Sequence, residues 1–222
     1  FYDPKKSNKF LIWGSEVDTE RLDTSFKLGY VSPNLNYKSL GLQVSYNIHD
    51  QIGSYGYRVY DIKQQSFFTN FVYNSIIGNT RNKFKTGINF SSDKYQEVVD
   101  KFYYNRIDSS LGGFFEYNYD NLNNLSFIAG LRVDNHNRIG FFITPRFHLR
   151  YLPFKETSIR FSIGTGRKVS NIFAENQSLF GSNRLIEIEN NGVGVYGLNP
   201  EKALNYGFGI NHKFLLFDRP LN

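Results

Sequence analysis

The chain has 222 residues, a formal net charge of +6, and neither cysteine nor methionine. Without cysteine it forms no disulfide bond and no thiolate metal site, and without a run of about 18 apolar residues it has no transmembrane helix. The lysines and arginines are spread along the chain and form no single block, so the positive charge does not by itself indicate nucleic-acid binding.

Aromatic residues make up 18% of the sequence, with 16 tyrosines and 22 phenylalanines. Outer-membrane β-barrels gather aromatic side chains in girdles at both membrane interfaces. Aromatic residues also favour the strands of soluble β-rich domains. Composition therefore leaves two classes open, a membrane barrel and a soluble β domain.

Apolar and polar residues alternate along most of the chain, which is typical of strands with one apolar and one polar face. In one such segment Leu40, Leu42 and Val44 share a face, and Gly41 and Gln43 share the other. No segment has a convincing helical period. We predict about nine strands, near residues 22–32, 38–49, 63–76, 82–92, 109–119, 124–134, 140–152, 157–165 and 202–215.

The connections between these strands alternate in length. Short turns rich in Asn, Pro, Gly or Asp are predicted near 33–37, 77–81, 120–123 and 153–156. Longer loops are predicted near 50–62, 93–108 and 166–201, and 135–139 is a short exception among them. Transmembrane barrels have short turns at one end and long loops at the other, whereas a soluble sandwich has no reason to keep this order. The pattern favours an all-β, antiparallel transmembrane β-barrel.

A sheet of about nine strands does not make a complete barrel, because single-chain bacterial barrels have even strand numbers. An open sheet in lipid would also leave the backbone groups of its edge strands unsatisfied. We therefore expect residues 1–222 to be part of a larger barrel of about 22 strands, and the chain to be an internal piece of a longer protein.

The alternation assigns one face of the sheet to lipid and the other to the lumen. The residues expected to point outward are Phe127, Leu131, Phe147, Ile159, Phe161 and Phe208. Charged residues on consecutive strands have the opposite phase, and we expect them on the lumen wall, where they pair across strands, contact a plug domain or remain solvated. These are Glu116, Arg132, Asp134, Arg146 and Arg160, together with Arg150.

Several segments resemble the barrel region of TonB-dependent receptors, in the same order and spacing. They are Phe-Phe-Glu-Tyr at 114–117, Gly-Leu-Arg-Val-Asp at 130–134, Thr-Pro-Arg at 144–146, Arg-Phe-Ser-Ile-Gly-Thr-Gly at 160–166, and Asn-Pro-Glu at 199–201 followed by Asn-Tyr-Gly at 205–207. The chain departs from the family after Gly166, where Arg167, Lys168 and Ser170 replace the usual aromatic, arginine and proline.

The resemblance implies an outer-membrane receptor that takes up a scarce ligand, an iron–siderophore or a cobalamin-like chelate in the common case and an oligosaccharide in the main alternative. The implied partners are membrane lipid and lipopolysaccharide, the small-molecule or oligosaccharide ligand, and the TonB complex. TonB would act through a plug domain that this chain does not include. Neither nucleic acid nor a cofactor is implied.

The family's long loops face the outside of the cell and bind the ligand, which makes aromatic and basic residues in these segments the candidates for contact. Tyrosines would stack on an apolar or aromatic ligand face, and arginines would bind an anionic chelate. The alternative is that the tyrosines form the outer girdle and the arginines touch lipopolysaccharide. The candidates are Tyr55, Tyr57, Arg58, Tyr60, Tyr103, Tyr104, Arg106, Arg167 and Arg184.

Signals for catalysis are poor. The four histidines His49, His136, His148 and His212 are scattered without metal-ligand spacing, and no nucleophile elbow or phosphate loop is present. We therefore expect no enzyme. The alternative function is a soluble or surface β domain for glycan binding or adhesion, which the tyrosine-rich segments would suit.

Overall fold

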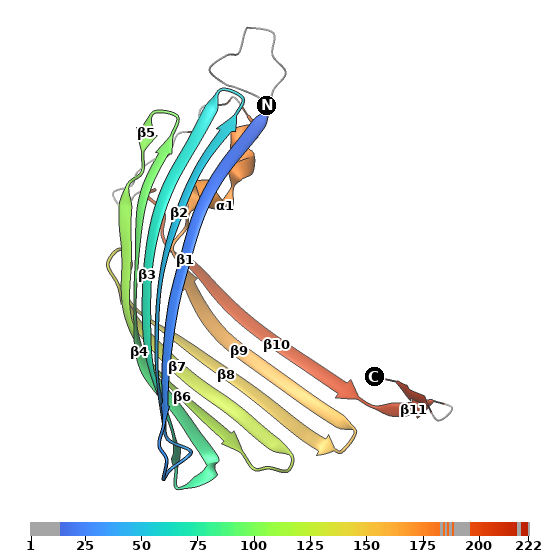
Figure 1. Ribbon diagram of the computed structural model, residues 1–222. Coiled ribbons are helices and arrows are strands. Elements are labelled where there is room, and N and C mark those ends of the chain that lie inside the picture. The colour runs from blue at the N-terminus through green and yellow to red at the C-terminus, as the bar shows by residue number, and fades with distance from the viewer. Residues whose placement is uncertain are drawn as a thin grey trace.

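The computed structural model describes residues 14–182, 184, 186, 188, 196–216 and 219–221. In this part of the chain, ten strands form one antiparallel sheet, and two short ones form a separate hairpin (Figure 1). The sheet contains β1 (Ser15–Val31), β2 (Ser39–Tyr55), β3 (Arg58–Ile77), β4 (Asn79–Val99), β5 (Phe102–Tyr103), β6 (Arg106–Asp120), β7 (Leu125–His136), β8 (Gly140–Phe154), β9 (Thr157–Lys168) and β10 (Glu201–His212). The hairpin pairs β11 (Phe214–Leu216) with β12 (Arg219–Leu221), and two short helices, α1 (Ile172–Glu175) and η1 (Gln177–Gly181), lie between β9 and β10.

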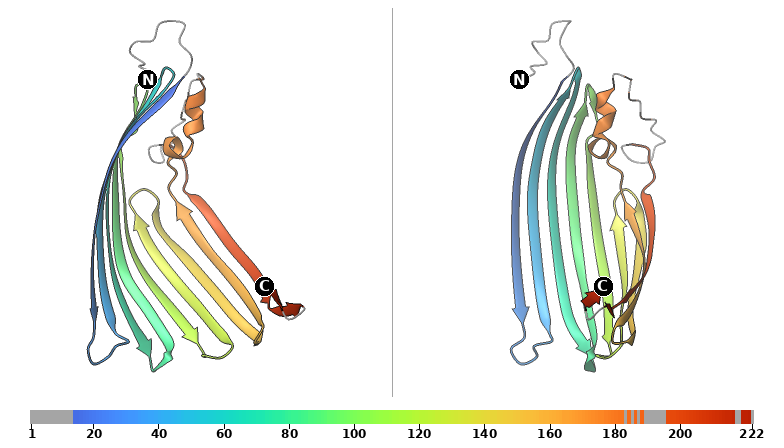
Figure 2. Two further views of the ribbon diagram at one scale, coloured as in Figure 1. Left: turned by 45° about the vertical axis from the view of Figure 1, so that its right-hand side comes forward. Right: turned by 90° about the vertical axis from the view of Figure 1, so that its right-hand side faces the viewer.

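Each long strand pairs with its neighbour in sequence, and β5 is a short addition to β4. The sheet curves strongly and stays open, so that β1 and β10 are its edges within the described residues (Figures 1 and 2). The predicted fold class is confirmed: the structure is an all-β, antiparallel, partial barrel built on nine long strands. No helix in the described ranges is long and apolar enough to cross a membrane.

The register gives the sheet two chemically different faces. Leu28, Leu42, Phe71 and Ile88 are successive partners from β1 to β4 and form an apolar row. On β6 to β10, register places Phe127, Phe161 and Phe208 on the same face as one another. This face is convex, because α1 and η1 lie on the opposite, concave side (Figure 2). The apolar convex row is the surface that a lipid bilayer would cover.

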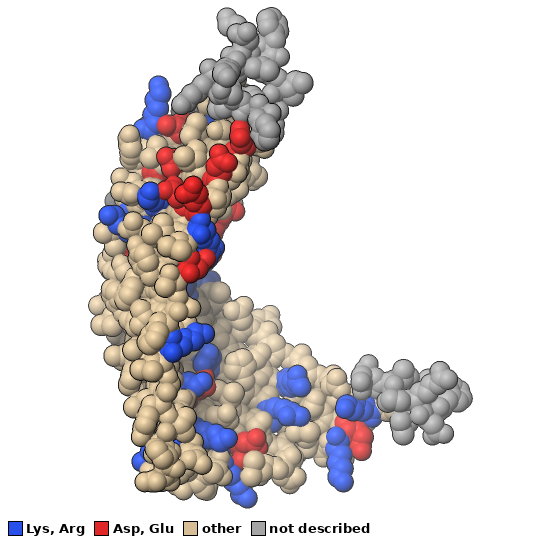
Figure 3. Space-filling model, in the orientation of Figure 1, with Lys and Arg blue, Asp and Glu red and all other residues tan. Residues whose placement is uncertain are grey.

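The predicted orientation of the wall residues agrees with this register. Arg132, Arg146 and Arg150 of β7 and β8 alternate with the apolar convex residues and lie on the concave face, as does Arg160 of β9. Basic side chains are visible in the hollow of the sheet. Acidic side chains gather toward the end of the sheet at which β1 starts (Figure 3).

The two ends of the strands differ. One end, which we call the turn end, has short connections; Asn121 closes one of them, because its side-chain oxygen accepts hydrogen bonds from the backbone N–H groups of Asn123, Asn124 and Leu125 at 2.9–3.0 Å. The other end, which we call the loop end, carries the β9–β10 connection. This connection is the longest excursion, as predicted, and it lies at the same end as the β2–β3 and β4–β6 hairpins.

The predicted long loops near 50–62 and 93–108 are wrong. Those residues continue the strands: β2 runs to Tyr55 and β3 starts at Arg58, and β4 runs to Val99 before β6 starts at Arg106. As a result β1 to β4 are 17 to 21 residues long, whereas β7 and β9 have 12. Crossing a bilayer takes only about 9–11 residues of strand, so β1 to β4 extend well beyond it.

The convex face shows where the membrane part ends. Eight residues along β1 from Leu28, Glu20 lies opposite Asp50, which in turn lies opposite Lys63. The Lys63 ammonium is 2.6 Å from the Asp50 carboxylate. Charged groups in this row fit water or lipid headgroups and not hydrocarbon, so the apolar belt ends between this row and Leu22.

Candidate functional site

The loop between β9 and β10 folds back onto the concave side of the strand extensions at the loop end (Figure 2). Phe173 of α1 and Phe180 of η1 are fully buried there. Phe180 stacks on Tyr55 and Tyr60 with ring centroids 5.2 and 5.1 Å apart, and Phe173 lies 5.0 Å from the ring of Tyr104. Four strand residues, Tyr55, Tyr60, Ile62 and Val99, complete this core together with Tyr196 of the same loop. We call this the mouth cluster.

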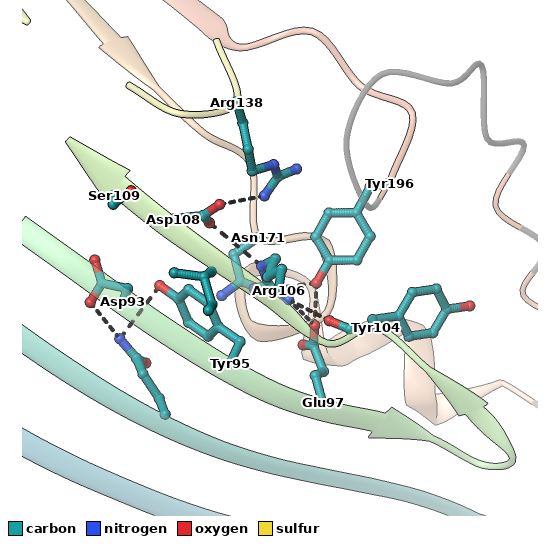
Figure 4. A network of polar contacts seen from close by, with 12 residues as sticks. Asp93, Tyr95, Glu97, Tyr104, Arg106, Asp108, Ser109, Arg138, Asn171 and Tyr196 are labelled. Carbon is teal, nitrogen blue, oxygen red and sulfur yellow. Dashed lines mark hydrogen bonds and ion pairs between the residues drawn. The ribbon is translucent and has the colours of Figure 1, made fainter. Parts of the chain in front are cut away.

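A buried ion pair lies beneath the mouth cluster (Figure 4). The Arg106 guanidinium on β6 is 2.5 Å from the Glu97 carboxylate on β4, with side-chain exposures of 2% and 0%. The Tyr60 hydroxyl donates a hydrogen bond to Glu97 at 2.8 Å, and the Tyr196 hydroxyl donates another. Buried charges are tolerated when paired and hydrogen-bonded in this way.

Aromatic rings and a second carboxylate hold the Arg106 guanidinium in place. It lies over the Tyr95 ring at 3.9 Å and near the Tyr196 ring at 5.0 Å, which are cation–π distances. Its Nε is 3.6 Å from Asp108, and Asp108 accepts a 2.8 Å hydrogen bond from Arg138. Tyr196 comes from the loop and Arg138 from the β7–β8 turn, so the network ties three parts of the loop end together.

Burial changes the acidity of the loop tyrosines. Burial raises the pKa of the Tyr196 hydroxyl, and the negative charge of Glu97 raises it further. Burial likewise raises the pKa of Tyr104. Both hydroxyls therefore stay protonated at neutral pH, and Tyr196 remains a hydrogen-bond donor to Glu97.

A polar cavity of about 220 Å³ adjoins this network on the concave side. Its lining combines Asp93 and Asp108 with Arg106, Arg167 and His136. It is smaller than the roughly 300–1,000 Å³ of drug-sized ligand pockets. The cavity therefore fits a polar group of a ligand and not a whole chelate.

The structure divides the nine predicted ligand-loop residues into two groups. Tyr57 and Tyr103, at 76% and 74% exposure, stand out at hairpin tips, and Arg167 and Arg184 are also exposed. The Arg167 guanidinium lies 5.6 Å from the centre of the Phe142 ring. The remaining five are buried or partly buried around the mouth cluster: Tyr55, Arg58, Tyr60, Tyr104 and Arg106.

Arg58 is a direct link to the loop. Its guanidinium donates a hydrogen bond to the backbone carbonyl of Arg184, and it lies 3.5 Å from the Asp100 carboxylate. The Tyr55 hydroxyl donates to the Gln177 side chain at 3.5 Å. In this conformation both side chains are therefore occupied in holding the loop.

Four of the predicted lumen charges form ion pairs. Arg132 makes two 2.7 Å hydrogen bonds to Asp134, two residues along the same strand. Arg146 pairs with Glu116 across strands, and Lys85 lies 4.0 Å from the same carboxylate. Arg160 has a different environment, because register places it opposite Arg150.

Sequence reasoning missed five residues of the mouth cluster, Ile62, Val99, Phe173, Phe180 and Tyr196, and three residues beside it, Tyr95, Glu97 and Asn171. One signal was present. Tyr95, Glu97 and Val99 alternate before Asp100, and Tyr104, Arg106 and Asp108 alternate after it, so opposite charges share one phase of two adjoining segments. Read as a hairpin and not as a loop, this pattern would have placed Glu97 near Arg106.

Comparisons with protein families and with solved structures relate this geometry to a family. The family model for TonB dependent receptor-like β-barrels matches residues 2–222. Among solved structures, the copper transporter OprC superposes with a TM-score of 0.64 at 13% identity, over 87% of this chain and 36% of that chain. A comparison with curated protein sequences gave no match.

Two receptors of known structure have a similar fold. The siderophore receptor PirA of Pseudomonas aeruginosa gives a TM-score of 0.63 at 11% identity, over 90% of this chain and 37% of that chain. The alcaligin outer-membrane receptor FauA of Bordetella pertussis gives 0.61 at 14% identity, over 93% and 36%. The chain thus spans little more than a third of the length of each structure that it resembles.

Proposed function

Because the chain belongs to the family of TonB dependent receptor-like β-barrels, we propose that it forms part of a receptor that imports a scarce ligand with energy delivered through TonB. Barrels of this family lie in the outer membrane of Gram-negative bacteria, where long loops face outward and short turns face the periplasm. The loop end is then extracellular, and the mouth cluster lies where a ligand first meets the receptor.

The observation that carries the proposal is the position of the β9–β10 loop. It is packed into the extracellular mouth on the concave side and leaves a mixed-charge cavity next to exposed aromatic and basic side chains. We propose an iron–siderophore or cobalamin-like chelate as the ligand. Copper, a siderophore and alcaligin appear in the names of the similar structures, which supports a metal-related cargo. An oligosaccharide is the alternative cargo.

The two groups of candidate residues have different roles in this proposal. Tyr57, Tyr103, Arg167 and Arg184 are exposed and would contact the ligand, the tyrosines by stacking and the arginines by charge-assisted hydrogen bonds. Tyr55, Arg58, Tyr60, Tyr104 and Arg106 would position the loop that presents them.

Shortening the loop between Arg167 and Gly197 in the full-length protein tests this assignment. We expect ligand binding and uptake to be lost while the barrel still assembles, because the spanning strands are fixed by internal hydrogen bonds and lipid contact. Assembly is measured as heat-modifiable barrel in outer membranes, and uptake with labelled chelates and oligosaccharides. If uptake of every candidate ligand survived the deletion, this loop would not be the binding surface.

The second candidate function is a surface β domain that binds glycans without transport. The exposed tips at Tyr57 and Tyr103 favour it, because tyrosine rings stack on sugars. The apolar convex face disfavours a soluble form, because it would expose a large apolar surface to water. Uptake measured with and without TonB separates the two functions, because a binding module or passive pore would be indifferent to TonB.

A further inference from the structure

The polar cavity next to the mouth cluster has a lining of mixed charge, and part of that charge is already paired (Figure 4). Its charged side chains are Asp93, Arg106, Asp108 and Arg167. Arg106 is neutralised by Glu97 at 2.5 Å, and Asp108 accepts a 2.8 Å hydrogen bond from the guanidinium of Arg138. His136 also lines the cavity, and its Nδ1 accepts the backbone N–H of Arg138 at 3.1 Å, so its ring is not doubly protonated. Charge in this part of the lining is therefore balanced.

Among the described residues, Asp93 and Arg167 are the two lining charges without an ion pair. Asp93 Oδ1 accepts hydrogen bonds from the neutral side chains of Ser66 and Gln64, whereas Oδ2 has no partner in the described part of the chain. Arg167 is exposed, and its guanidinium lies 5.6 Å from the centre of the Phe142 ring. One cavity thus offers a ligand a carboxylate and a guanidinium, both unneutralised.

The buried Arg106 adds a third point of contact. Its side chain is 2% exposed and lines the cavity. Its Nε–H has no hydrogen-bond acceptor in the described structure, because the Asp108 carboxylate, at 3.6 Å, is beyond hydrogen-bond reach. A buried donor without an acceptor costs free energy, so a ligand oxygen beside it would be stabilised.

The two unpaired charges come from separate parts of the wall. Asp93 is on β4 and Arg167 is on β9, and three strands lie between these two in the sheet. Neighbouring strands are about 4.8 Å apart, so a group that meets both charges needs more reach than a single α-amino acid, whose ammonium and carboxylate share one carbon atom. The cavity volume of about 220 Å³ limits the group to a small one.

We propose that this cavity binds a short peptide-like group of the ligand, with an ammonium held by Asp93, a carboxylate held by Arg167 and an amide carbonyl facing the Nε–H of Arg106. Both ends form charge-assisted hydrogen bonds, and the carbonyl satisfies the buried donor. The inference rests on the proposed function, because it names the part of the imported ligand that the extracellular mouth recognises.

Binding of small probes to the full-length protein tests this assignment. Glycylglycine has all three features, N-acetylglycylglycine lacks the ammonium, and glycylglycinamide lacks the carboxylate. We expect glycylglycine to bind most tightly in saturation-transfer NMR competition, and each derivative to bind roughly tenfold or more weakly, because each loses a charge-assisted hydrogen bond. Glycine should also bind weakly, since its two charges lie too close together.

Substitutions assign the two ends separately. Asp93→Asn should weaken glycylglycine binding roughly tenfold and leave N-acetylglycylglycine unchanged, because that probe has no ammonium to lose. Arg167→Gln should weaken glycylglycine binding and leave glycylglycinamide unchanged. Asp61→Asn is the matched control, because it removes a carboxylate at the same end of the sheet but on the convex face, outside the cavity.

Absence of glycylglycine binding, or equal binding of the three dipeptide probes, would overturn the proposal. Affinity of Asp93→Asn equal to that of the Asp61→Asn control would overturn it too, as would Asp93-dependent binding of Ca²⁺ alone in place of glycylglycine. If a variant fails to assemble, the comparison of probes on the unsubstituted protein still tests the proposal. Uptake that is independent of TonB, with probe discrimination intact, would count against the proposed function and leave this site standing.

Discussion

At the loop end, the side chains of Glu97 and Arg106 are 0% and 2% exposed, whereas toward the turn end Arg150 and Arg160 lie exposed on the same concave face. The sheet backbone is alike in both regions. The difference is the β9–β10 loop, which packs Phe173 and Phe180 over the first region, whereas none of its described residues lines the hollow around Arg150 and Arg160. A single curved sheet has no core of its own, and the buried hydrophobic residues of the described structure all belong to the cluster that the loop covers.

The comparison also shows how charge is handled in the two regions. Because Glu97 and Arg106 are covered, their charges must be neutralised by each other. The Glu97 carboxylate accepts two further hydrogen bonds, from Tyr60 of β3 and from Tyr196 of the loop. The uncovered wall tolerates an Arg–Arg pair because water screens exposed charge.

Removing one partner of the buried pair should have the largest effect. Arg106→Ala leaves Glu97 buried without its counter-ion, and we expect the packed loop to lose roughly 3–5 kcal/mol of stability. Hydrogen exchange of the amides in 171–181 would report the loss as faster exchange. The matched control is Glu175→Gln, which breaks an exposed pair with Lys168 and should change nothing measurable.

A double substitution sharpens this result. Glu97→Leu with Arg106→Met replaces the pair by apolar side chains of similar size and should recover much of the protection lost in Arg106→Ala. Slow exchange in Arg106→Ala itself would contradict the view that this ion pair holds the loop.

Phe161→Arg should have the next largest effect, and it falls on the membrane belt. Phe161 lies on the convex apolar face of β9, and an arginine facing lipid at mid-depth costs about 2–4 kcal/mol. We expect less heat-modifiable barrel in outer membranes. Asn205→Arg on β10 is the control, because Asn205 lies on the concave face opposite Gly164 and has room there. Equal assembly of the two variants would refute the assignment of faces.

The membrane belt was predictable from sequence because lipid imposes its own pattern. Where one face meets hydrocarbon and the other meets water, apolar and polar residues alternate, and the predicted strand near 22–32 ends within one residue of Val31. The nine long strands follow from that alternation.

The strand extensions were missed because they lie outside the lipid, where no such alternation is imposed. Beyond the belt, the convex face of β2 and β3 carries Asp50 and Lys63, and the concave face carries Tyr55, Tyr60 and Ile62 of the mouth cluster. Alternation is lost although the backbone pairing continues, so 50–62 and 93–108 resembled loops. The mouth cluster depends on contacts between segments about 100 residues apart, such as Tyr196 with Glu97, and no local pattern encodes such a contact.

The smallest effect should appear only at high pH, and it concerns the hydroxyl of Tyr196. Burial and the charge of Glu97 raise its pKa in the folded protein above the ordinary value of about 10. A group whose pKa is raised on folding contributes stability that is complete below the unfolded pKa and is lost as pH rises through the folded pKa. Loop protection should therefore be constant to about pH 10 and fall at higher pH.

Ultraviolet titration of tyrosinate measures this directly. The difference between the native protein and Tyr196→Phe isolates one hydroxyl, which should ionise well above pH 10, whereas the same difference in denaturant should titrate near 10. Tyr60, Tyr95, Tyr104, Glu97 and Arg106 face the same network and are unchanged in both proteins. If the native difference titrated at the denatured value, Tyr196 would be open to water, and the loop would not pack against the strand extensions as the structure has it.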